Sequence, residues 1–272
     1  MTVYVLGALN VDLVTRVPHH PAPGETIMGR SAGRFAGGKG GNQAMAAARA
    51  GVEVVMVGCV GDDDLGTAYL ARLTDAGLRT QIARAGDQPT GTALITVSDD
   101  GENSIIVIPG ANESASAPSG LTASDVLLCS LEVSLEVVAS AARAAHAAGA
   151  RVVLNLAPYA DLPADVIALA DPVVVNETEA GQLQDAGLRP VSVVTTLGSQ
   201  GATWTRGSGE VAREAGIGVR RVVDSTGAGD TFCGALAAAL ARGLDDAAAL
   251  REANAAGAQA VSWQGAQPDG SL

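Results

Sequence analysis

Six short apolar runs, with segments of helical periodicity between them and after the last, constrain the fold of this chain more than any other feature. The runs are continuous rather than alternating, as expected for strands that are buried on both faces of a parallel sheet. They lie at residues 3–9, 52–60, 126–131, 151–156, 172–175 and 191–197. The helical patterns lie at 40–50, 63–76, 134–148, 177–186, 227–242 and 246–261. This order predicts an α/β fold with a doubly wound, mostly parallel sheet flanked by helices. The length of 272 residues allows one large domain or two modest ones.

Two segments interrupt this rhythm. Residues 13–36 are rich in proline and show no helical pattern, and residues 91–109 predict a β-hairpin around Asp99–Asn103. The two segments can pair into a small β-sheet that covers the edge of the main sheet as a lid. An exposed loop beside an ordinary hairpin explains the same residues equally well.

Composition excludes several classes of partner. A net charge of −12 argues against binding to nucleic acid, which requires a basic face. The apolar stretch from Thr231 to Ala241 is too short to span a bilayer, so we expect no membrane partner. The opening residues are typical of a β-strand rather than a signal peptide. Cys59, Cys129 and Cys233 form no CxxC pair and are expected to be buried free thiols, which predicts a cytoplasmic protein.

The most informative motif is DSTGAGD at residues 224–230, which precedes a helical run of small residues. Gly227, Ala228 and Gly229 can expose backbone N–H groups at a helix N-terminus, which is a ready site for an anion. Asp230 follows in the first turn, where it can accept a proton from a hydroxyl that attacks phosphorus. Acidic residues are also common at helix N-termini without any such role. Because Asp224 and Asp230 flank the turn on both sides, we favour the functional interpretation.

A second glycine-rich motif, GGKGGN at residues 37–42, opens another predicted helix. It lacks the spacing of a nucleotide phosphate loop and of a dinucleotide-binding fingerprint. Its glycines permit close approach to a small polar ligand, to which Lys39 and Asn42 can donate hydrogen bonds. A plain glycine-rich helix start is the alternative.

Polar side chains also gather at the ends of the predicted strands, where ligands bind in doubly wound sheets. These residues are Asn10, Asp12, Glu132, Asn155 and Asn176, with Glu179 three residues after the last. Asn10 and Asp12 point the same way from an extended segment and suit the vicinal hydroxyls of a sugar. A turn around Gly198 and Gly201, after a strand that stops at Thr196, can approach a nucleotide or serve as an ordinary β-turn.

Taken together, these motifs resemble the ribokinase-like carbohydrate kinase family. The matching segments are N-x-D at the first strand, PGET at 23–26, GGKGGN at 37–42, NETE at 176–179, TLGSQG at 196–201, DSTGAGD at 224–230 and GAQP at 265–268. They occur in family order and span nearly the whole chain. The resemblance implies one domain over residues 1–272, with a lid at about 13–36 and 91–109 through which the chain forms a homodimer.

The resemblance also implies a role for each matching residue. The small sugar substrate would be held by Asn10, Asp12, Gly38, Lys39, Asn42 and Glu132, with Asp230 as catalytic base and the backbone of Gly227, Ala228 and Gly229 as the anion hole. ATP would contact Asn176, Thr196, Gly198, Gly201, Gly229 and Asn254. Glu179 would help to place Mg²⁺ through water. A monovalent cation, K⁺ in most of the family, would bind Asp224, Thr226, Ala260, Trp263, Gly265 and Asp269.

The reaction implied is the ATP-dependent phosphorylation of D-ribose at O5, giving ribose 5-phosphate and ADP. Two alternatives stay open. One is a kinase of another small sugar, such as deoxyribose or fructose, or of a nucleoside. The other is a sugar-binding protein with weak catalysis. Asp269 stands where the family commonly has serine, and the segment 177–195 is shorter than its family counterpart. A dehydrogenase is disfavoured because no G-x-G-x-x-G follows the first strand.

Overall fold

The computed structural model describes residues 1–207 and 209–272. Its main sheet has nine strands in the order β13-β12-β11-β10-β9-β8-β1-β4-β5. Their bounds are β1 Thr2–Leu6, β4 Glu53–Gly61, β5 Arg79–Ala85, β8 Val126–Ser130, β9 Arg151–Asn155, β10 Ala170–Asn176, β11 Ser192–Thr196, β12 Gly201–Arg206 and β13 Gly209–Ala215. Seven neighbouring strands run parallel, and β12 and β13 add an antiparallel edge. The predicted doubly wound, mostly parallel sheet is confirmed.

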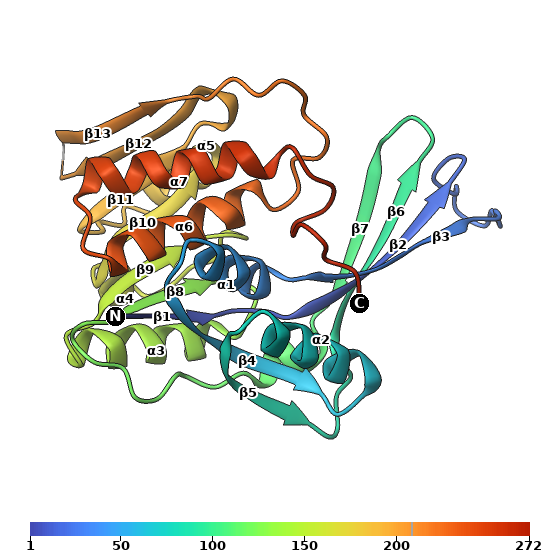
Figure 1. Ribbon diagram of the computed structural model, residues 1–272, viewed down its shortest axis with the longest axis horizontal. Helices are drawn as coiled ribbons and strands as arrows, with labels where there is room; N and C mark the ends of the chain where they lie inside the picture. The colour runs from blue at the N-terminus through green and yellow to red at the C-terminus, as the bar shows by residue number, and fades with distance from the viewer. Residues whose placement is uncertain (208) are drawn as a thin grey trace.

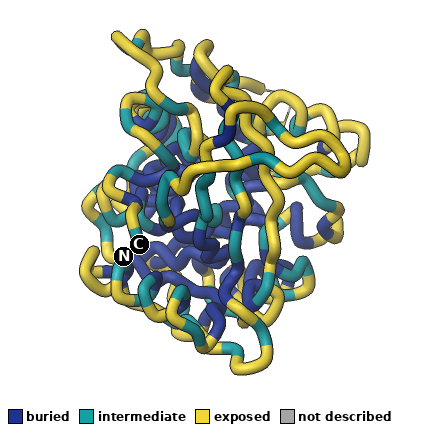
Figure 2. The backbone as a smooth tube through the Cα atoms, turned by 90° about the vertical axis from the view of Figure 1, so that its right-hand side faces the viewer, coloured by how far each residue is buried: buried dark blue, intermediate teal, exposed yellow. Residues whose placement is uncertain are grey.

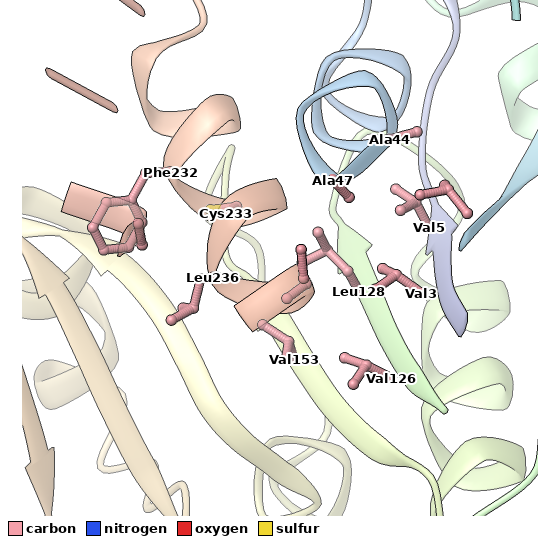
Figure 3. Packing of buried hydrophobic residues seen from close by; sticks show 14 of the residues in the cluster. Val3, Val5, Ala44, Ala47, Val126, Leu128, Val153, Phe232, Cys233 and Leu236 are labelled. Atoms are coloured by element: carbon pink, nitrogen blue, oxygen red, sulfur yellow. The ribbon is translucent and has the colours of Figure 1, made fainter. Parts of the chain in front are cut away.

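Helices cover both faces of this sheet (Figure 1). The helices are α1 Lys39–Arg49, α2 Asp64–Asp75, α3 Leu135–Ala147, α4 Ala164–Ile167, α5 Glu177–Asp185, α6 Ala228–Ala241 and α7 Asp246–Ala260, with 3₁₀ turns η1 Gly110–Ser114 and η2 Gly198–Gln200. Strand residues alternate between the two faces, so Val3 and Val5 pack in one core with α1, α2, α6 and α7. Tyr4 and Leu6 pack in the other core with α3, α4 and α5. Figure 3 shows the first core, with α1 and α6 above the strands.

The helix α6 lies unusually close to α1. A Cβ atom added at Gly234 of α6 would collide with the backbone of α1 at Gln43 and Ala47, so only glycine allows this approach. The close packing brings the first turn of α6, with Asp230, against the first turn of α1, with Asn42 and Gln43.

A second, smaller sheet projects from the main body at the right of Figure 1. It has the strand order β3-β2-β6-β7, with β2 at Asn10–Val17, β3 at Arg30–Gly37, β6 at Gly91–Ser98 and β7 at Asn103–Ile108. The small β-sheet expected from residues 13–36 and 91–109 is therefore present. Figure 2 looks at the molecule from this side, where exposed chain dominates in front of the buried interior.

The end of the chain is bonded to this small sheet. The N–H of Ala36 donates to the carbonyl of Gly270 at 2.7 Å, and the N–H of Leu272 donates to the carbonyl of Arg34 at 3.0 Å. Ser271 forms an antiparallel bridge with Phe35 between them. Residues 270–272 thus act as a short additional strand on β3.

The structure differs from the sequence expectation in four strands. The strand expected at 3–9 ends at Leu6, and residues 7–9 lie between it and β2, which begins at Asn10. There the side chain of Asn112 accepts the N–H of Leu9 at 2.8 Å in place of a ladder partner. The edge strands β5 and β13, and β12 next to β13, were not predicted, since they carry many polar residues. The expectation of three buried free cysteines is confirmed. No helix within residues 1–207 and 209–272 is long and apolar enough to cross a membrane.

Candidate active site

Asp230 lies in the first turn of α6 and is 8% exposed. Each of its carboxylate oxygens accepts one hydrogen bond from an amide on α1. Asn42 Nδ2 donates to Oδ2 at 2.9 Å, and Gln43 Nε2 donates to Oδ1 at 3.1 Å. The two bonds hold the carboxylate in one orientation while part of it still borders a cavity of about 170 Å³.

The turn before Asp230 has the geometry of an anion site. Gly227 caps α6 with a left-handed backbone, φ 74°, and a Cβ there would come within 2.6 Å of Ala266 Cα, so glycine is required. A Cβ at Gly229 would instead meet no atom within 4 Å, because this residue faces open space. The N–H of Ala228 donates to the carbonyl of Ser225 at 3.3 Å. The first N–H groups of a helix have no intrahelical acceptor, so that of Gly229 adds positive partial charge beside Asp230.

Lys39 lines the same small cavity as Asp230, and Glu132 is hydrogen-bonded to the backbone of Lys39. The backbone N–H of Lys39 donates to Glu132 Oε2 at 2.8 Å, which ties the start of α1 to the end of β8. Burial would lower the pKa of Lys39, but the charges of Asp230 and Glu132 outweigh it and raise that pKa. Burial raises the pKa of Glu132, partly offset by the charge of Lys39. Lys39 is therefore a fixed cation next to Asp230.

Asn10 and Asp12 begin β2, the first strand of the small sheet. Asp12 lines a cavity of about 610 Å³ between this sheet and the C-terminal loop. Burial, and then the charge of Glu132, raise the pKa of Asp12 to about 7. Asn10 is 3% exposed, and its Oδ1 accepts a hydrogen bond from Asn112 Nδ2 at 2.8 Å, so its own amide N–H groups are left for a ligand. Gly38 caps the N-terminus of α1 and lies against the backbone of Ala8 and Asn10.

Residues expected to contact a nucleotide line two adjoining cavities on the other side of Asp230. Thr196, Gly198, Gly201, Gly229 and Asn254 line a cavity of about 360 Å³ with mainly apolar neighbours. Thr196 and Gly229 also line the smaller cavity that contains Asp230. Asn254 donates one N–H of Nδ2 to the carbonyl of Ala215 at 2.8 Å, so its oxygen and its second N–H are left for a ligand.

Asn176 and Glu179 line the small cavity with Lys39 and Asp230. The two residues form a capping box at the start of α5. Glu179 N–H donates to Asn176 Oδ1 at 2.9 Å, and Asn176 N–H donates to Glu179 Oε2 at 2.8 Å. One oxygen of Glu179 stays without this bond and can face a hydrated metal ion.

The residues expected to bind a monovalent cation lie on two neighbouring loops. Asp224 accepts the N–H of Thr226 at 2.9 Å and the N–H of Gly265 at 3.0 Å. Burial acts to raise the pKa of Asp224, but these backbone bonds outweigh it and lower that pKa. The residues of this set that line the same cavity as Asp12 are Asp224, Thr226, Gly265 and Asp269.

The other two expected cation ligands are less well placed. Ala260 and Trp263 are not among the residues that line this cavity, and the carbonyl of Ala260 accepts the N–H of Trp263 at 3.4 Å. Across residues 1–207 and 209–272, no three His, Cys, Asp or Glu side chains are grouped as metal ligands. Any metal here must therefore rely on backbone carbonyls, water or substrate for most of its ligands.

Three polar residues of the site were not predicted from sequence. Gln43 is fully buried and bonds both Asp230 and Asn155. Gln267 is 2% exposed and donates to Asn42 Oδ1 at 2.9 Å. Arg72 of α2 donates in turn to Gln267. The sequence signal that could have identified Gln43 is its position, directly after the glycine-rich motif and before the small apolar residues AMAAA, where a polar residue is expected to be buried only if it is hydrogen-bonded.

The chain is similar to carbohydrate kinases over nearly its whole length. Residues 2–271 match the model of the pfkB family carbohydrate kinases. The ribokinase of Bacillus subtilis is 39% identical, with 97% of this chain and 94% of the relative covered. The ribokinase of Haemophilus influenzae is 36% identical, with 98% and 94% covered. The structure of Arabidopsis thaliana ribokinase complexed with ribose and ATP superposes with a TM-score of 0.86 at 29% identity, with 97% of this chain and 93% of that chain covered.

Proposed function

This chain belongs to the pfkB family of carbohydrate kinases, and we propose that it transfers the γ-phosphoryl group of ATP to O5 of D-ribose. The products are ribose 5-phosphate and ADP. A bond forms between O5 and the γ-phosphorus, the bond from that phosphorus to the β,γ-bridging oxygen breaks, and the proton of the hydroxyl leaves with the base. Relatives named ribokinase at 36–39% identity, over nearly the full length, support ribose as the acceptor.

One observation carries the proposal. Asp230 and Lys39 line a cavity that shares Thr196 and Gly229 with the larger cavity expected to hold the nucleotide. Asn42 of α1 donates to the carboxylate of Asp230. A hydroxyl held by α1 would lie between the carboxylate and a phosphate bound at the start of α6. Asp230 accepts the proton, a step that contributes typically ~10²–10⁴-fold to rate.

The sugar is held by side chains from three elements. Lys39 and Asn42 donate from α1, Glu132 and Asp12 accept from β8 and β2, and Asn10 donates through its free amide. The backbone of Gly38 approaches from the cap of α1. Donors and acceptors therefore alternate around the site, as a polyhydroxyl ligand requires.

ATP occupies the cavity lined by Thr196, Gly198, Gly201 and Asn254, with its phosphates toward Asn176 and the N–H groups of residues 227–229. These N–H groups stabilise the negative charge that develops on the transferred phosphoryl oxygens. The apolar walls of this cavity suit a flat base.

Two metal ions are part of the proposal. Mg²⁺ is usually held by one or two carboxylates together with phosphate oxygens and water, and Glu179 fits that role. When bound, it neutralises charge on the phosphates. A monovalent cation, K⁺ by family resemblance, fits the oxygens of Asp224, Thr226, Gly265 and Asp269, with less support from Ala260 and Trp263.

We further propose that the small sheet closes over the sugar as a lid and joins two copies of the chain. One face of this sheet lines the large cavity through residues such as Val14 and Ile105. The opposite face carries a cross-strand row of Leu13, Leu94 and Ile106. Leu94 is 40% and Ile106 is 61% exposed, which suits an interface with a second copy. The three free cysteines support a reducing, cytoplasmic location.

The direct test is ADP release from ATP and Mg²⁺, with and without K⁺, across ribose, deoxyribose, fructose and nucleosides. We expect ribose to give the highest kcat/KM. Asp230→Asn should lower kcat by about a hundredfold or more and leave ribose affinity close to normal. Asp99→Asn, at the exposed tip of the β6–β7 hairpin, is the matched control. Near-normal turnover by the Asp230 variant would refute its role as base, and turnover on another acceptor alone would refute ribose.

A further inference from the structure

A continuous chain of side-chain hydrogen bonds connects helix α2 to Asp230. Arg72 donates from Nε and Nη2 to Gln267 Oε1, at 3.2 and 3.0 Å. Gln267 Nε2 donates to Asn42 Oδ1 at 2.9 Å, and Asn42 Nδ2 donates to Asp230 Oδ2 at 2.9 Å. The four residues come from α2, the C-terminal loop, α1 and α6.

The direction of every bond in this chain is determined by its two ends. An arginine side chain can only donate, so Gln267 must turn its oxygen toward Arg72 and its NH₂ group toward Asn42. Asn42 must then accept through its oxygen and present its own NH₂ group to Asp230. An ionised carboxylate can only accept, so both ends require the same orientation of the two amides.

Burial makes this orientation costly to change. Gln267 is 2%, Asn42 6% and Asp230 8% exposed, so water cannot readily replace a mismatched bond. Reversing either amide would place two oxygens or two NH₂ groups face to face, and an unmet buried donor or acceptor is expensive.

We propose that Arg72 is a positioning residue for the phosphoryl transfer proposed above. It acts through Gln267 and Asn42, and it keeps an N–H donor, rather than an oxygen, directed at the carboxylate of Asp230. The inference rests on the proposed function, because its kinetic consequence is a loss of sugar phosphorylation.

Arg72 also holds the C-terminal loop in place, because its Nη1 donates to the carbonyl of Asp269 at 2.6 Å. A purely structural role in that loop is therefore the competing explanation. Gln267→Glu separates the two roles. The new carboxylate still accepts from Arg72, and the ion pair keeps it ionised, so the loop stays pinned. It cannot donate to Asn42, however, so Asn42 either faces the new carboxylate with its own oxygen or turns its amide over and presents oxygen to Asp230.

The test compares Gln267→Glu and Arg72→Met with wild type and with Arg84→Met. Arg84 of β5 donates to Asp62 at 2.9 Å and to Thr67 at 3.1 Å. Thr67 lies on α2, as Arg72 does, so Arg84→Met controls for the loss of an arginine contact with that helix. We expect both relay variants to lower kcat for ribose by about tenfold to a hundredfold, the worth of one hydrogen bond to a charged group. KM for ATP should stay close to wild type in both relay variants, as should all values for Arg84→Met. The unfolding midpoint of Gln267→Glu should fall, because one buried hydrogen bond is mismatched.

A second readout does not depend on turnover. The side-chain amide resonances of Asn42, assigned by comparison with Asn42→Asp, should shift in both relay variants and stay in place in Arg84→Met. Wild-type kcat together with an unshifted Asn42 resonance in Gln267→Glu would overturn the relay. If the wild type itself phosphorylates no sugar, the proposed function fails, and the Asn42 resonance alone decides whether Arg72 orients the amides.

Discussion

Substituting Asp12 by asparagine should remove a specific pH dependence of stability. Burial and the charge of Glu132 raise the pKa of Asp12 from 3.8 to about 7. The folded state therefore binds a proton more tightly than the unfolded state between these values, and wild-type stability must fall as the pH rises through this window. Between about pH 5.5 and the folded pKa, an interval of about 1.5 units, stability falls by about 1.4 kcal/mol per pH unit, and above that pKa it falls no further. The ionisation of Asp12 alone should therefore lower the free energy of unfolding of wild type by about 2 kcal/mol between about pH 5.5 and about pH 8.5.

Asp12→Asn carries no such proton and should escape that loss. The assay is urea unfolding of wild type and variant at about pH 5.5 and about pH 8.5, without sugar, followed by tryptophan fluorescence. We expect the free energy of unfolding of the variant to gain about 2 kcal/mol relative to wild type between the two conditions. Asp99→Asn controls for the loss of one negative charge. A difference between Asp12→Asn and wild type that does not change with pH would refute the argument from burial.

The remaining predictions concern the anion site, the metal and the small sheet. Gly227→Ala should cost about 2 kcal/mol or more of stability, because it combines a strained backbone with a collision at Ala266, whereas Gly229→Ala should fold normally and raise KM for ATP. Circular dichroism melting and initial rates check both, and an equal melting loss in the two variants would contradict the geometry. Chelation of Mg²⁺ with EDTA should abolish ADP release and leave the melting temperature nearly unchanged; a large drop would mean a structural metal. Ile106→Lys, on the exposed face of the small sheet, should shift a dimer toward monomer in analytical ultracentrifugation, and an unchanged mass would contradict an interface there.

The central part of the fold was predictable because its strands are buried on both faces. Runs such as VEVVMVGCV and VLLCS contain almost no polar residue, and a continuous apolar run of this length, rich in β-branched residues, is typical of a buried parallel strand. The edge strands were missed for the opposite reason. In β5, RTQIARA, only partial burial is required, so its composition is close to that of a loop. The residues alone left open whether the two segments of the small sheet pair, since pairing of β2 with β6 joins residues far apart in the chain.

The same distinction applies to the site. Asp230, Lys39 and Asn42 stand in short glycine-rich motifs, so local pattern was enough to single them out, and the structure brings them together. Their roles in binding and catalysis stay predictions. Gln267 lies 225 residues from Asn42 along the chain, and no local pattern reveals that such a bond exists. Arg72 lies on an ordinary amphipathic helix and is indistinguishable by sequence from any surface arginine.

The strand-like segment at residues 270–272 has a consequence for which changes in chain length the protein can tolerate. Gln267 is fixed at one end by Asn42 and Arg72, and Ser271 is fixed at the other by its bridge to β3. The residues between them form a tight turn, in which Asp269 has a left-handed backbone with φ 56°. One inserted residue would force either the relay or the pairing with β3 out of register. We therefore expect insertions and deletions between these two points to be far more damaging than most substitutions there, while the exposed turn at residues 99–102 should accept added residues readily.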